Sequence, residues 1–110
     1  MFRRVLAAST LAFALATAQG HADELQTYRV SIKDHRFLPA ELHVPAGKPF
    51  FLEIVNEEAQ VDEFEMSAPP LEKLVQPGAS GKVRVRPLAN GRFPFFDDFH
   101  PPTTGAVVAE

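Results

Sequence analysis

The chain has 110 residues, a formal net charge of −3 and no cysteine. This length accommodates one domain, and the acidic balance argues against nucleic acid as a partner, because nucleic-acid binding depends on clustered Lys and Arg. The lack of thiols excludes iron–sulfur clusters, cysteine-type zinc sites and thiolate nucleophiles.

The first 22 residues have the layout of a secretory signal peptide. A basic start with Arg3 and Arg4 precedes an apolar run over residues 5–18, and small residues follow it. We expect cleavage after Ala22, with Ala18 as the alternative. The apolar run of about 14 residues is shorter than the ~20 that a membrane-spanning helix needs; an uncleaved anchor is the competing interpretation. The sequence therefore predicts a soluble periplasmic protein with its domain over residues 23–110.

Short extended segments open the predicted domain. Residues 28–33 alternate apolar and polar side chains with the period of two that a half-buried strand shows. A turn over residues 34–36 follows. Residues 37–47 are expected to be extended, because Pro39 and Pro45 are incompatible with a helix interior.

Further strands are predicted in the second half of the chain. Residues 49–55 and 61–66 are rich in aromatic and branched side chains, as strands are. Residues 67–75 read as irregular, with room for one helical turn. Residues 81–86 alternate again, and a turn over 88–91 leads to the terminal segment. No amphipathic helix of useful length is present, so we predict an all-β fold, a Greek-key β-sandwich of six to eight strands.

The terminal segment, residues 92–109, is expected to be an aromatic strand, a loop and a last apolar strand. The loop holds Asp97, Asp98 and His100, followed by two prolines that stiffen it. Two carboxylates and an imidazole are ligands for hard and borderline cations. Adjacent residues of an extended chain point to opposite faces, so one of the two aspartates at most is expected to bind directly unless the loop twists.

A second acidic cluster lies upstream, at Asp62, Glu63 and Glu65. Glu63 and Glu65 share one strand face and repel each other unless a cation or an arginine lies nearby. Asp62 is expected on the opposite face. We predict that this cluster and the terminal loop form one metal site. Its predicted ligands are Glu63, Glu65, Asp97, Asp98 and His100, and the secondary candidates are Asp62, His35, His43 and Met66.

The order of short motifs resembles the cupredoxin family. These motifs are Phe-x-Pro-x-x-Leu-x-Val-Pro-Ala-Gly at residues 37–47, the strand at 51–56, Gln-Pro-Gly at 76–78 and Gly-x-Val-Val at 105–108. The resemblance covers nearly the whole domain and implies a cupredoxin-like sandwich. A blue-copper site uses two His, a Cys and a weak axial Met. Here Asp97 or Asp98 falls about where the Cys would be, and Gly105 lies near the axial position, so a type 1 copper centre is excluded.

Two runs narrow the resemblance further. Asp-Glu-Phe-Glu at residues 62–65 and Phe-Phe-Asp-Asp-Phe-His-Pro at 95–101 are similar to cupredoxin-like periplasmic components of bacterial ferrous-iron uptake systems of the Ftr and Efe type. This likeness implies an iron or copper ion as cofactor and a role in ferrous-iron uptake or oxidation. It also implies a periplasmic iron-binding protein or an inner-membrane permease as partner. The small number of histidines leaves open a homodimer in which a second chain completes the site.

The alternative is a metal-free sandwich that docks on a permease or a periplasmic partner through Phe99 and the Pro101-Pro102 loop. An enzyme in its own right is not expected, apart from a ferroxidase-like redox role. The chain has no nucleophile–base pair, phosphate-cradling glycine loop or nucleotide motif that we can identify.

Overall fold

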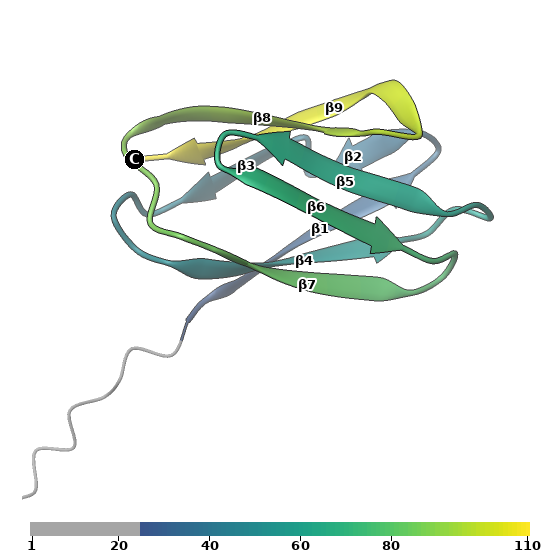
Figure 1. Cartoon of the computed structure of the whole chain (residues 1–110), viewed down its shortest axis with the longest axis horizontal. Coiled ribbons are helices and arrows are strands. Elements are labelled where there is room, and N and C mark those ends of the chain that lie inside the picture. The colour runs from purple at the N-terminus through teal and green to yellow at the C-terminus, as the bar shows by residue number, and fades with distance from the viewer. Residues whose placement is uncertain (1–24) are drawn as a thin grey trace, which may run out of the picture.

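The computed structural model describes residues 25–110 and shows two β-sheets packed face to face (Figure 1). The predicted signal peptide lies outside the described residues. Every regular element within residues 25–110 is a strand, which confirms the prediction of an all-β sandwich. Within the same range, no helix has the length and apolar character needed to cross a membrane.

One sheet has the strand order β2-β1-β4-β7, and the other has the order β3-β9-β8-β5-β6. The first sheet consists of β1 (Thr27–Lys33), β2 (Arg36–Leu38), β4 (Phe50–Asn56) and β7 (Ser80–Val85). The second consists of β3 (Glu41–Val44), β5 (Asp62–Ser67), β6 (Pro70–Val75), β8 (Gly91–Asp97) and β9 (His100–Ala109). The described residues thus form nine strands rather than the six to eight expected.

The segment predicted to be irregular is a strand. Residues 70–75 form β6, which pairs antiparallel with β5 at the edge of the larger sheet. The prolines at 69 and 70 suggested a break in regular structure. However, Pro70 is the first residue of an edge strand, where the missing N–H group removes no necessary ladder hydrogen bond.

The predicted terminal loop is shorter than expected. Asp97 pairs with His100 across β8 and β9, so only Asp98 and Phe99 form the turn. The next pair up the ladder is Phe96 with Thr104, and the register shift between the two pairs leaves residues 101–103 without partners in β8. This bulge re-aims the start of β9, and it is the reason that His100 lies at the end of a strand rather than in a long loop.

The core between the sheets is aromatic at the end that carries the acidic residues. Phe37, Phe64 and Phe95 are almost fully buried, and the rings of Phe37 and Phe95 lie edge to face with centroids 4.8 Å apart. Burial of each such side chain contributes about 1.5–3 kcal/mol. Because Phe64 and Phe95 lie on paired strands that also carry acidic residues, the core holds those residues in place.

Candidate metal centre

Three carboxylates converge at one end of the sandwich. Glu58 comes from the β4–β5 loop, Asp62 begins β5 and Asp97 ends β8. One oxygen atom from each lies within 4.8 Å of the others. Asp62 and Asp97 have no exposed surface. We call Glu58, Asp62 and Asp97 the inner cluster.

Several oxygen atoms of the inner cluster lack a hydrogen-bond partner. They are both oxygens of Asp62, Oδ2 of Asp97 and Oε1 of Glu58. Within residues 25–110, no Lys or Arg forms an ion pair with any of the three residues. Burial, and then the neighbouring Asp97 and Glu58 carboxylates, raise the pKa of Asp62 to about 8. Crowded buried carboxylates are costly unless they are protonated or paired, so the arrangement can accept a cation.

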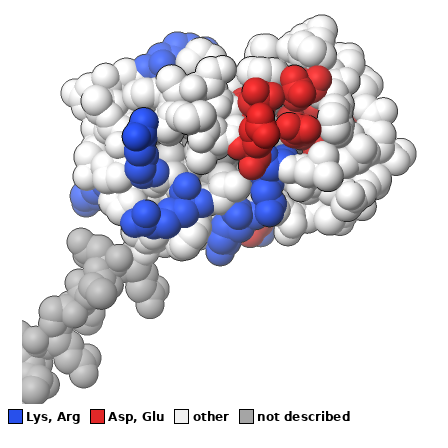
Figure 2. Space-filling model, viewed as in Figure 1, with Lys and Arg blue, Asp and Glu red and all other residues white. Residues whose placement is uncertain are grey.

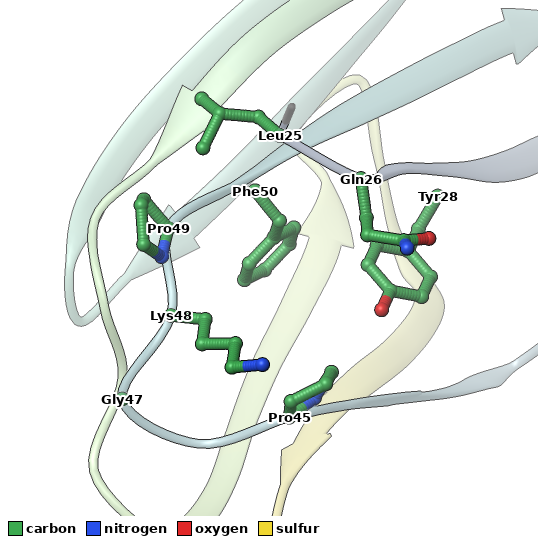
Figure 3. Close-up of a pocket in the computed structure, with 8 residues that line it drawn as sticks. All are labelled: Leu25, Gln26, Tyr28, Pro45, Gly47, Lys48, Pro49 and Phe50. Atoms are coloured by element: carbon green, nitrogen blue, oxygen red, sulfur yellow. The ribbon is translucent and has the colours of Figure 1, made fainter. Parts of the chain in front are cut away.

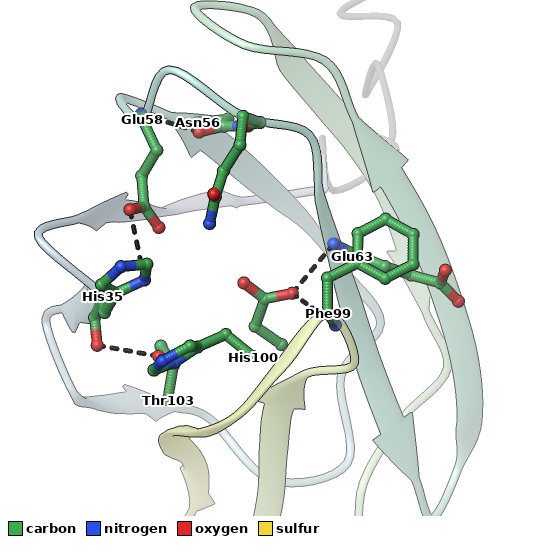
Figure 4. A network of polar contacts seen from close by, with 9 residues as sticks. His35, Asn56, Glu58, Glu63, Phe99, His100 and Thr103 are labelled. Carbon is green, nitrogen blue, oxygen red and sulfur yellow. Dashed lines mark hydrogen bonds and ion pairs between the residues drawn. The ribbon is translucent and has the colours of Figure 1, made fainter.

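Asp97 is held with one oxygen anchored and the other free. Its Oδ1 accepts hydrogen bonds from the backbone N–H groups of Glu63, at 3.1 Å, and Phe99, at 3.0 Å. These bonds attach the side chain to the backbone of β5 at Glu63 and to the β8–β9 turn at Phe99 (Figure 4). Oδ2 is therefore presented to the inner cluster in a defined orientation.

Asn56 shapes the loop that carries Glu58. It is fully buried, and its amide nitrogen donates to the carbonyl oxygens of Gln60, at 2.7 Å, and Val75, at 3.0 Å. Its amide oxygen accepts the backbone N–H of Glu58 at 2.8 Å. Because every polar atom of this side chain has a partner, these bonds restrict the conformation of the loop.

A histidine lies beside the inner cluster with a defined tautomer. The hydroxyl of Thr103 donates to the carbonyl oxygen of His35 at 2.8 Å. A hydroxyl has one proton, so its 2.7 Å contact with Nδ1 of His100 requires the imidazole to be the donor. In neutral His100 the lone pair is then on Nε2, which is the form that can bind a metal ion.

A second acidic group lies on the outer face of β5. Glu63, Glu65 and Glu72 bring oxygen atoms within 4.8 Å of one another, and they contribute to the red patch in Figure 2. Burial raises the pKa of both Glu63 and Glu65. The nearby carboxylates of Glu72 and Asp98 raise both pKa values further. We call Glu63, Glu65, Glu72 and Asp98 the outer patch. Its residues are half-buried or exposed.

The predicted ligands do not form one site. Asp97 belongs to the inner cluster and His100 lies next to it, whereas Glu63, Glu65 and Asp98 belong to the outer patch. The two groups lie on opposite faces of β5, because alternate residues of a strand point to opposite sides of the sheet. The division of Asp97 from Asp98 agrees with the expectation that adjacent aspartates diverge.

The secondary candidates are also divided. Asp62 is part of the inner cluster, and His35 lies close to it, with Nδ1 3.4 Å from Glu58 Oε2. His43 lies between Glu41 and Glu110, at 3.2 and 2.9 Å, away from both acidic groups. Met66 is a core residue, 1% exposed.

Sequence reasoning missed Glu58. The signal that was present is Asn56 at the end of an apolar strand, two residues before an acidic side chain, because such an Asn often caps the following turn. Gly105, which falls near the axial position of a blue-copper site, lies within β9 opposite Phe95.

A separate pocket of about 380 Å³ lies at the other end of β1 and β4 (Figure 3). Tyr28, Phe50 and Lys48 contribute to its wall. The described residues that line it include no His, Asp or Glu, so it offers no metal ligands of these types.

Comparison with solved structures defines the class of fold. The structure matches that of a mutant of amicyanin in its reduced state with a TM-score of 0.63 and 21% identity, over 76% of this chain and 82% of that one. It matches auracyanin A, described as a "blue" copper protein from Chloroflexus aurantiacus, with a TM-score of 0.69 and 16% identity, over 79% of this chain and all of that one. These similarities show a cupredoxin-like fold.

A sequence comparison gives the family. The family model described as "Cupredoxin-like domain" matches residues 5–109, so the chain belongs to the cupredoxin-like domain family. It is also 35% identical over 86 residues to "Uncharacterized protein RP394" of Rickettsia prowazekii (strain Madrid E), over 78% of this chain and 69% of the relative. The absence of cysteine means that the residues present do not fit a type 1 copper centre.

Proposed function

We propose that this protein binds a metal cation at the inner cluster. Glu58, Asp62 and Asp97 would supply carboxylate oxygens, and His100 would supply Nε2. The observation that carries the proposal is the set of four buried carboxylate oxygens without a hydrogen-bond partner. A cation would provide the counter-charge that the surrounding residues lack.

The donor set limits the choice of ion. Carboxylate oxygens and one imidazole suit ferrous or ferric iron, manganese or cupric copper rather than cuprous copper, which prefers thiolate and thioether ligands. A bound iron or copper ion would supply one-electron redox chemistry. We propose iron or copper as the native ion and a role in ferrous-iron uptake or oxidation, in the periplasm after export.

The protein's own residues have distinct parts in binding. Asp97 enters with one oxygen already fixed by two backbone N–H groups, so little side-chain entropy is lost. Asp62 would bind as the carboxylate and would lose its proton to solvent, because a ligand carboxylate must be ionised. The Thr103 contact fixes the His100 tautomer, as partners of metal-bound imidazoles commonly do.

The proposal is tested by calorimetric titration and thermal unfolding with Fe²⁺ under anaerobic conditions, Cu²⁺, Mn²⁺ and Zn²⁺. We expect at least one ion to stabilise the protein, by about 2.7 kcal/mol when its concentration is 100 times Kd. Asp62→Asn should abolish the stabilisation. Glu63→Gln, one residue away on the outer face, is the matched control and should retain it. Absence of stabilisation by every ion would show that the proposal is wrong.

A second candidate function is a docking module without a metal. The supporting observation is that Phe99, at the tip of the β8–β9 turn and beside Asp98, is 51% exposed. A permease or periplasmic partner would then bind this tip. In that case Phe99→Ala weakens binding to a reconstituted candidate permease, whereas Asp62→Asn leaves the binding unchanged.

A further inference from the structure

His35 occupies a backbone conformation that its side chain disfavours. It is the second residue of the two-residue turn between β1 and β2, and both Asp34 and His35 have positive φ, at 51° and 58°. Two positive φ angles in such a turn are typical of type I′, which Asn-Gly and Asp-Gly adopt most readily. A residue other than glycine in this region costs on the order of 1 kcal/mol. The turn alone therefore favours glycine at position 35.

A hydrogen bond to the backbone of His35 connects the β1–β2 turn to the candidate site. The carbonyl oxygen of His35 accepts a 2.8 Å hydrogen bond from the hydroxyl group of Thr103. Thr103 is buried, with 3% of its surface exposed. Thr103 belongs to the bulged part of β9 in the other sheet. This contact places the His35 ring at the polar end of the sandwich (Figure 4).

The ring contacts two residues of the proposed site. It stacks on the ring of His100, with centroids 4.1 Å apart and planes 19° apart. Its Nδ1 lies 3.4 Å from Oε2 of Glu58, whose other oxygen is buried without a partner. The ring thus lies against one oxygen of Glu58, while the other oxygen belongs to the inner cluster.

The stacked geometry decides which role the ring has. A metal ion lies in the plane of the imidazole that binds it, and two nearly parallel stacked planes do not meet near the rings. His35 and His100 therefore cannot bind one ion together as they are placed. The geometry agrees instead with a role in which His35 contacts the proposed ligands Glu58 and His100 without binding the ion itself.

We propose that His35 is a positioning residue of the cation site, holding Glu58 and His100 in the orientation that binds the ion. The inference rests on the proposed function. It explains why a histidine occupies a turn position that glycine would fill with less strain.

The test is the substitution His35→Gly, which gives the turn its preferred Asp-Gly sequence. We expect the metal-free variant to unfold at the same temperature as the wild type or higher. Titration with Fe²⁺ under anaerobic conditions, Cu²⁺, Mn²⁺ and Zn²⁺ should show affinity about 10–100-fold lower than that of the wild type for each ion that stabilises the wild type, as for other residues that orient metal ligands. His43→Asn, a change at a histidine outside both acidic groups, is the control and should leave the affinity unchanged.

The outcomes separate the two proposals. If the wild type binds no ion, the proposed function is wrong and this inference fails with it. If the wild type binds an ion and His35→Gly binds it equally well, the cation site stands and His35 has no part in it. A variant that loses affinity together with metal-free stability would show that His35 is a structural residue, which also contradicts the inference.

Discussion

Asp62 is the residue at which the stability and the proposed function of this protein conflict. It is fully buried next to Asp97 and Glu58. Burial and these neighbours raise its pKa to about 8, so the metal-free protein holds a proton there at neutral pH. An apolar or amide side chain would fit the position at lower cost, and a cation bound as proposed would offset the cost of the carboxylate.

We predict that Asp62→Asn raises the unfolding free energy of the metal-free protein at pH 8 by about 1–3 kcal/mol, because it removes a buried ionisable group without changing the side-chain shape. Urea unfolding at pH 8 in the presence of a chelator measures this change. Glu63→Gln serves as the control and should alter stability by less than about 0.5 kcal/mol. A destabilised Asp62→Asn protein would contradict the prediction.

Asn56 holds the loop that carries Glu58 through three side-chain hydrogen bonds. Replacing it with Ala removes the donor to the buried carbonyl oxygen of Val75 and to the partly buried carbonyl oxygen of Gln60. We predict a loss of about 2–4 kcal/mol of stability, together with weaker cation binding, measured by urea unfolding and titration. Asn90→Ala, at an exposed position, should leave both unchanged.

At the scale of elements, the β8–β9 hairpin brings the site together. Its two-residue turn places Asp97 opposite His100, and the bulge that follows brings Thr103 to both histidines. The hairpin depends on close packing at Gly105, where the Phe95 ring lies over the backbone. Strand pairing and core packing therefore both hold Asp97, His100 and Thr103 in position.

Gly105→Ala tests this packing. A Cβ at position 105 would lie 2.6 Å from Cζ of Phe95 and 2.8 Å from the carbonyl oxygen of Ala40, closer than real contacts allow. We predict destabilisation of about 1–3 kcal/mol, with a lower unfolding temperature by calorimetry. The neighbouring Thr104→Ala change, at an exposed residue, should have little effect, and equal effects of the two would contradict this account.

At the scale of the whole molecule, folding, protonation and cation binding are linked at the inner cluster. The folded protein retains the Asp62 proton up to about pH 8, whereas the unfolded chain releases it near the ordinary value of 3.8. This group therefore favours folding most strongly below about pH 4, and that contribution is lost as the pH rises towards 8. A bound cation acts in the opposite sense, because it requires the ionised form.

We predict that the unfolding temperature of the metal-free protein falls between about pH 4 and pH 8 relative to Asp62→Asn, and that a saturating cation stabilises the protein increasingly over the same interval. Thermal unfolding of both proteins across this range, with chelator and with ion, measures the difference. Parallel pH profiles for the two metal-free proteins would show that Asp62 is not the group responsible.

The fold followed from local patterns. Alternation along residues 28–33 and 81–86, and the prolines at 39 and 45, predicted strands because each reflects interactions within a few residues. Residues 67–75 were predicted to be irregular because Pro69 and Pro70 suggested a break in regular structure, whereas residues 70–75 form an edge strand. Asp97, Asp98 and His100 were predicted together because they lie within four residues of one another in the chain, and the structure pairs Asp97, not Asp98, with His100 across the hairpin.

The order of residues alone was enough to predict an all-β sandwich, the absence of a thiolate copper site and the presence of two acidic segments. The packing of the two sheets was needed to show that Asp97 joins Asp62 and Glu58 inside, while Glu63, Glu65 and Asp98 lie outside. The physical reason is that a strand alternates its side chains between two faces, and the partner across the sandwich decides which face is buried. The β4–β5 loop, the β1–β2 turn and the β8–β9 hairpin meet only when both sheets have packed.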